Sequence, residues 1–154
     1  MNRDEKKAMG LVTASHGLVH LYEGVLPPLI PLLIGVFQTD YFHLGLVVTL
    51  FSYAFGLGSL PAGFLADRFG PRPLLNFFLF GSGVTAVWIW ASDSLLSYAV
   101  LMGFVGFFCS TSHPAANTLI SHAIREKGKA FGINGIAGSL GVAVVPALSA
   151  WLGI

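Results

Sequence analysis

Three side chains that can bind a proton or a ligand recur along one stretch of otherwise apolar sequence. His16, His20 and Glu23 are spaced i, i+4 and i+7. On an α-helix these positions lie within about 60° of one another, so they share one face. An imidazole gains or loses a proton near neutral pH. The spacing therefore predicts a proton-coupling or substrate-binding site, with a satisfied polar contact inside a helical bundle as the structural alternative.

The same three side chains allow a third interpretation. Two histidines and one carboxylate on a helix face can ligate zinc. The chain shows no hydrolytic constellation around them, so we favour the proton or substrate site, assign no metal and expect no cofactor.

A second polar stripe lies nearly a hundred positions later. Ser110, His113 and Asn117 again follow three- and four-residue spacing, and Pro114 should loosen the helix there. We take His113 and Asn117 as further candidates for substrate or proton contact, with hydrogen bonds between helices as the alternative.

The elements that must position these residues are membrane helices. Hydrophobic residues make up 55% of the chain and charged residues 10%, whereas a soluble domain carries roughly 25% charged residues. Helices are the form in which such continuous apolar runs satisfy their backbone in lipid. An ionisable group at mid-membrane costs about 2.5–3.5 kcal/mol, so the polar stripes must face a cavity or other helices. Five spans are predicted, at about 11–37, 43–66, 73–92, 95–123 and 129–153.

The charges are sorted by position. All eight Lys and Arg fall on one side of the predicted spans, whereas the other side holds Asp40 and Asp93. The positive-inside rule then places the N-terminus in the cytoplasm. We expect an integral, multi-pass protein of the bacterial inner (plasma) membrane. The basic residues are too few and too dispersed for nucleic-acid binding, and the single Cys109 excludes an internal disulfide.

The loop at 63–73 joins the second and third predicted spans. Asp67 ends a helix, where its charge is not favoured by that helix's own dipole, so it needs another partner. We predict a cluster of charges between this loop and the next basic loop, in which Glu126 meets Arg68 or Arg72.

The pattern Gly63-x-Leu65-Ala66-Asp67-Arg68-x-Gly70-x-Arg72 resembles the signature loop between helices 2 and 3 of the major facilitator superfamily. The usual form has two adjacent basic residues after the second glycine, and Pro71 stands in place of the first. We expect this loop to act as a cytoplasmic latch, because Asp67 has no evident helix N-terminus close by to stabilise its charge. Its candidate residues are Gly63, Asp67, Arg68, Gly70, Arg72 and, from the next basic loop, Glu126.

The resembled family has twelve spans in two six-helix halves, with the substrate site between them and spans 1 and 4 lining it. We therefore expect an all-α membrane protein whose residues 1–154 form five helices of the N-terminal six-helix bundle. The chain would be an N-terminal fragment, completed by the C-terminal half or by a partner bundle.

The fifth predicted span carries a glycine every third residue: Gly132, Gly135, Gly138 and Gly141. Such a ridge of small residues favours tight helix packing. The ridge is similar to the glycine-rich fifth-helix motif of the family's antiporters. It departs from that motif because Val145 precedes Pro146 where a glycine would be expected, so symport and antiport both stay open. We also expect that Asn134 could face the cavity.

The sequence has no phosphate-binding loop of the Gly-x4-Gly-Lys-Ser/Thr type, so an ion gradient or the substrate's own gradient would supply the energy. We predict a secondary active transporter of a small solute, coupled to a proton or another ion, and not an enzyme. The alternatives are a membrane assembly subunit without transport of its own and a membrane-embedded metal enzyme.

Overall fold

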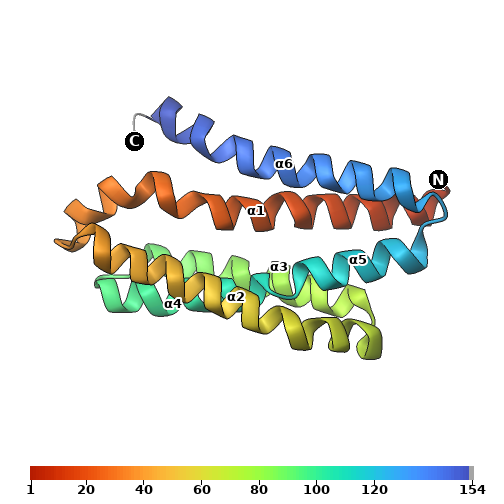
Figure 1. Ribbon diagram of the computed structural model, residues 1–154, viewed down its shortest axis with the longest axis horizontal. Helices are drawn as coiled ribbons and strands as arrows, with labels where there is room; N and C mark the ends of the chain where they lie inside the picture. The colour runs from red at the N-terminus through yellow and green to blue at the C-terminus, as the bar shows by residue number, and fades with distance from the viewer. Residues whose placement is uncertain (153–154) are drawn as a thin grey trace.

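The computed structural model describes residues 1–152, which form six α-helices and, within that range, no strand (Figure 1). The helices are α1 (Arg3–Phe37), α2 (Tyr41–Phe69), α3 (Pro71–Trp90), α4 (Leu95–Cys109), α5 (Ser112–Ala123) and α6 (Lys127–Leu152). Five helical segments are long and apolar enough to cross a membrane, and the segment Leu95–Ala123 combines α4 and α5. The predicted all-α membrane class is confirmed.

The helices form two groups. α1 and α6 run side by side along most of their length, whereas α2 and α3 pack against α4 (Figure 1). α5 contacts α1, α2 and α3 and so joins the two groups. Residues on α1 and α5 therefore meet inside the bundle.

One end of the bundle carries all eight Lys and Arg, and we call it the basic end. It consists of the start of α1, the α2–α3 turn and the α5–α6 loop, which lie at the same end in Figure 1. The α2–α3 turn is a single residue, Gly70, whose φ of 85° is a conformation that favours glycine. Pro71 follows as the first residue of α3, where no N–H is needed.

The opposite end is closed by side-chain caps. Asp40 caps α2 by accepting a hydrogen bond from the His43 N–H at 2.9 Å. This bond and a second one from the His43 ring hold the pKa of Asp40 below its usual range. Ser94 caps α4 in the same way through Ser97. These short caps explain how the chain reverses within a few residues.

The core has two parts. One lies toward the basic end and includes Val12 and Ala115, and the other includes Val19 and Val105. Ser15 and His16 of α1 lie between Val12 and Val19, and so interrupt the apolar core along α1. Pro27, Pro28 and Pro31 all lie inside α1, which continues through them to Phe37.

Candidate functional site

Three histidine rings from two helices come together at the interruption in the core. The centroids of His16 and His20 on α1 lie 4.7 Å apart, and His113 on α5 lies 5.0 Å from His16 and 5.4 Å from His20. All three side chains are half-buried. The two stripes found in the sequence thus contribute to one site, which we call the histidine cluster (His16, His20 and His113).

A chain of short contacts links the cluster to α6 and to a carboxylate. His16 Nδ1 lies 2.6 Å from the main-chain oxygen of Asn134, and His16 Nε2 lies 3.1 Å from His20 Nε2. His20 Nδ1 lies 2.5 Å from Glu23 Oε2. Every nitrogen of the two α1 rings therefore has a polar partner within hydrogen-bond distance.

The number of protons in this chain follows from the atom types. A carbonyl oxygen only accepts, so His16 Nδ1 carries a hydrogen. The contact between two Nε2 atoms needs a second hydrogen, and the contact between His20 Nδ1 and Glu23 needs a third. Two neutral imidazoles and a carboxylate supply only two hydrogens for these three contacts. All three contacts are hydrogen bonds at once only when one further proton is shared by His20 and Glu23.

A break in the fourth membrane segment places His113. The hydroxyls of Ser110, Thr111 and Ser112 each donate to the carbonyl three residues earlier, in competition with regular helical bonding. Pro114 has no N–H, which leaves the Ser110 carbonyl without its helical donor, and Ser59 of α2 donates to that carbonyl at 3.2 Å. α5 then restarts with His113 in its first turn.

The glycines of α6 make room for the imidazoles. A Cβ at Gly138 would lie 2.6 Å from His16 Cε1, and one at Gly141 would collide with the main-chain oxygen of Gly17. Gly132 and Gly135 differ, because a Cβ at either would meet nothing within 4 Å. The glycine ridge therefore has two halves, and only the half nearer the C-terminus packs against α1.

A pocket of about 240 Å³ opens beside Glu23. Tyr22 and Glu23 of α1 line it together with Phe51 and Phe55 of α2. Phe55 also meets the His113 ring edge-on, with centroids 5.8 Å apart. The carboxylate is thus partly exposed to a small cavity that adjoins the histidine cluster.

Not every candidate joins the site. Asn117 lies one turn after His113 but is exposed, and within the described residues its side chain makes no hydrogen bond, so it lies apart from the cluster. Asn134 does contribute, but through its main-chain oxygen, while its own side-chain oxygen is buried without a partner in the described chain. No pattern in the sequence marks a main-chain acceptor.

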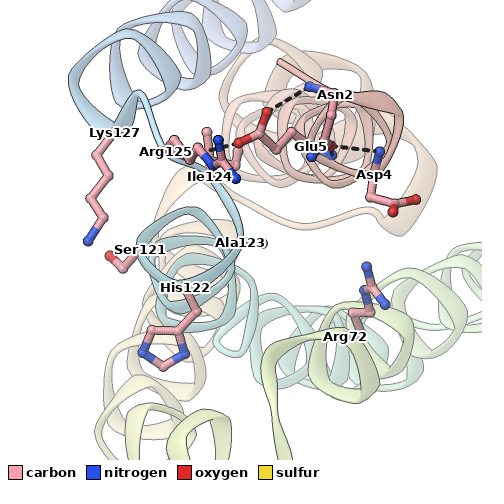
Figure 2. A pocket seen from close by; sticks show the side chains of 10 residues that line it. All are labelled: Asn2, Asp4, Glu5, Arg72, Ser121, His122, Ala123, Ile124, Arg125 and Lys127. Carbon is pink, nitrogen blue, oxygen red and sulfur yellow. Dashed lines mark hydrogen bonds between the residues drawn. The ribbon is translucent and has the colours of Figure 1, made fainter.

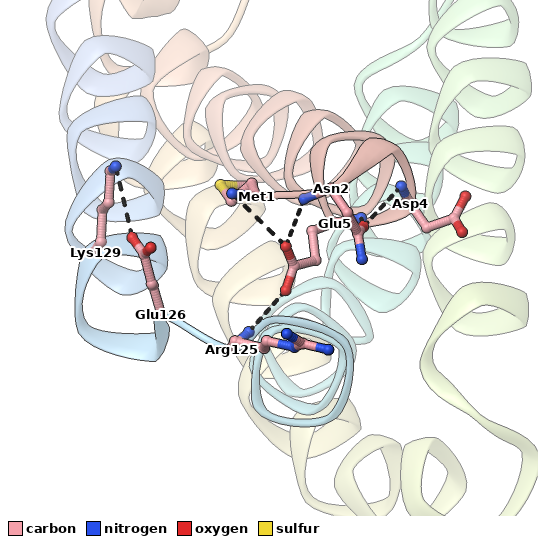
Figure 3. A network of polar contacts seen from close by, with 7 residues as sticks. All are labelled: Met1, Asn2, Asp4, Glu5, Arg125, Glu126 and Lys129. Atoms are coloured by element: carbon pink, nitrogen blue, oxygen red, sulfur yellow. Dashed lines mark hydrogen bonds and ion pairs between the residues drawn. The ribbon is translucent and has the colours of Figure 1, made fainter.

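The residues of the signature loop lie at the basic end. Asp67, Arg68 and Arg72 are exposed, and Gly63 and Gly70 are half-buried. The predicted contact of Glu126 with Arg68 or Arg72 is not formed within residues 1–152: Glu126 pairs with Lys129 at 3.6 Å. Figure 3 shows this pair, with Glu126 in the loop just before α6 and Lys129 in the first turn of the helix.

The α5–α6 loop is instead tied to the start of α1, by Glu5. Glu5 Oε1 accepts a hydrogen bond from the Arg125 N–H at 3.2 Å, and its Oε2 accepts one from the Asn2 N–H at 2.7 Å (Figure 3). The carboxylate therefore ties the start of α1 to the α5–α6 loop. A pocket of about 430 Å³ lies beside it, between Glu5, His122 and Arg72 (Figure 2).

Known proteins resemble this chain along most of its length. A family model described as Major Facilitator Superfamily matches residues 12–154. A "Probable hexose phosphate transport protein" of Chlamydia pneumoniae is 24% identical over 79% of this chain and 27% of its own length. A "Probable L-galactonate transporter" of Escherichia coli is 28% identical over 70% of this chain and 24% of its own.

A "Probable sulfoacetate transporter SauU" of Cupriavidus necator is 30% identical over 68% of this chain and 25% of its own length. The chain spans about a quarter of the length of these curated relatives.

Proposed function

Since this chain belongs to the Major Facilitator Superfamily, we propose that it forms part of a proton-coupled secondary active transporter of a small solute. In this proposal its five membrane-spanning segments are five of the six spans of an N-terminal bundle. A second bundle completes the transport path. The observation that carries the coupling is the contact of His20 Nδ1 with Glu23 Oε2 beside a pocket, because these two atoms form a hydrogen bond when they share a proton.

Loss of that proton would change the structure around it. Without it, the lone pair of His20 Nδ1 and the Glu23 carboxylate face each other at 2.5 Å and repel. His20 can restore a hydrogen bond to Glu23 by carrying its hydrogen on Nδ1, but its Nε2 then no longer donates to His16. Protonation therefore selects between two hydrogen-bond patterns of the α1 side chains. A population shift requires such a difference in contacts.

The signature loop is proposed as a latch at the same membrane face. Asp67, Arg68 and Arg72 are exposed in the described chain and so are accessible to a second bundle. The positive-inside rule supports a cytoplasmic basic end, hence a cytoplasmic N-terminus, in a bacterial inner membrane.

The test is solute uptake by the native-length protein in proteoliposomes, with and without an imposed proton gradient. The substrates named for the relatives supply the first panel: a hexose phosphate, L-galactonate and sulfoacetate. Glu23→Gln keeps a donor for His20 Nδ1 but cannot release a proton. We expect this variant to lose acceleration by the gradient while it retains exchange of substrate across the membrane.

His20→Gln should behave in the same way, and His43→Gln is its matched control because His43 is exposed at the far end of the bundle. Uptake by Glu23→Gln that keeps the pH dependence of the wild type would refute the coupling.

A further inference from the structure

We propose that His16, His20 and His113 also form a binding site for a divalent transition-metal ion such as Zn²⁺. The metal would lie between the ring nitrogens that these histidines direct toward one another. The sequence suggested a zinc set on α1 alone, and we set it aside. The structure changes the donor set, because it brings His113 from α5 to the two imidazoles of α1 and leaves Glu23 as a partner of His20.

The spacing of the nitrogens fits a metal. One ring nitrogen from each histidine lies within 4.8 Å of the others. The Nε2 atoms of His16 and His20 are 3.1 Å apart. Two nitrogens that bind one tetrahedral Zn²⁺ at 2.0–2.1 Å are about 3.3 Å apart. The α1 pair thus already has the required separation, and a small rotation of His113 would bring in a third ligand.

The hydrogen bonds at the other nitrogen of each α1 ring also fit a metal site. A histidine that ligates a metal nearly always donates its other ring N–H to a carboxylate or a main-chain carbonyl. His16 Nδ1 faces the Asn134 carbonyl, and His20 Nδ1 faces the Glu23 carboxylate. Both rings are therefore held with Nε2 directed at the shared space, which leaves Nε2 as the metal-binding atom of each.

The ligand type restricts the metal. Three imidazoles suit Zn²⁺, Ni²⁺ or Cu²⁺, whereas Mg²⁺ and Ca²⁺ prefer oxygen. Three protein ligands leave a fourth position for water or a small anion. The site would exist whether or not the protein transports a solute, so the inference does not depend on the proposed function.

The experiment is calorimetric titration of the untagged, native-length protein in detergent with Zn²⁺, repeated in buffers of different ionisation enthalpy. We expect one ion per chain, and the repeat in different buffers separates the enthalpy of binding from that of buffer protonation. His16→Gln, His20→Gln and His113→Gln should each weaken binding at least 100-fold. Glu23→Gln should weaken it by about 10- to 100-fold, as loss of an outer partner does.

The matched control is the double variant His43→Gln, His122→Gln, which removes the two histidines outside the cluster. It should bind Zn²⁺ as the wild type does. Equal affinity in the wild type and His113→Gln would overturn the three-histidine site, as would loss of binding in the control.

A measurement on the wild type alone guards against variants that fail to fold. X-ray absorption at the zinc edge should show three imidazole nitrogens around the ion. Fewer than three would overturn the proposal.

Discussion

Gly138 of α6 lies directly against His16 of α1. A Cβ built on this glycine would stand 2.6 Å from His16 Cε1 and 2.9 Å from Cδ2 of His20, closer than side-chain atoms pack. The histidine cluster therefore requires a residue without a side chain at position 138 of the neighbouring helix. The contact also explains why α1 and α6 run side by side at the level of the site.

This contact predicts the effect of Gly138→Ala. The added methyl should displace both imidazoles and destabilise the protein by about 1–3 kcal/mol, as overpacking does. The measurement is thermal unfolding of the native-length protein in detergent.

Gly135→Ala is the control, because a Cβ there meets nothing within 4 Å and alanine favours a helix. Equal melting temperatures of the two alanine variants would contradict the packing described here.

A second glycine sets the distance between α2 and α4. A Cβ at Gly106 would collide with the main-chain oxygen of Phe51, which cannot move as a side chain can. We expect Gly106→Ala to lower the unfolding free energy by about 1–3 kcal/mol. The matched variant Gly83→Ala adds a methyl in open space on α3 and should raise it by up to about 1 kcal/mol, because alanine favours a helix.

Glu5 should control the opening of the α5–α6 loop. Glu5→Ala removes the acceptor for the Arg125 N–H and should speed hydrogen exchange of that amide by roughly tenfold. Asp4→Ala is the control, because the Asp4 side chain is exposed and Asn2 bonds only its main-chain N–H. Exchange that is equally fast in both variants would show that the carboxylate does not hold the loop.

The latch predicts an effect on transport without an effect on folding. Asp67 is exposed, so Asp67→Asn should leave the melting temperature within about 2 °C of the wild type. If a second bundle contacts the carboxylate, the uptake rate should fall severalfold in proteoliposomes. Asp93→Asn, at the exposed turn of the opposite end, should leave the rate unchanged. Normal uptake by Asp67→Asn would contradict the proposed role of this loop as a latch.

Composition and the length of the apolar segments predicted the all-α membrane class. Apolar runs of about 20 residues with so few charges leave helices as the plausible form, and the family match and the structure confirm that class. Local signals also marked the turn at Gly70 and Pro71, since glycine permits a positive φ and proline fixes φ at its own position. The helix breaks at Ser110 and Thr111, a few residues before Pro114, the proline from which a loosening was expected.

The sequence by itself determined the α1 part of the site, because i, i+4 and i+7 spacing places His16, His20 and Glu23 on one helix face whatever surrounds them. Only the tertiary structure decided that the His113 ring joins them and that Glu126, in the α5–α6 loop, pairs with Lys129 in the first turn of α6. Periodicity reports which residues share a helix face. It does not report which faces of different helices meet, because that depends on packing at residues such as Gly138 and Gly106, where the absence of a side chain lets another helix approach.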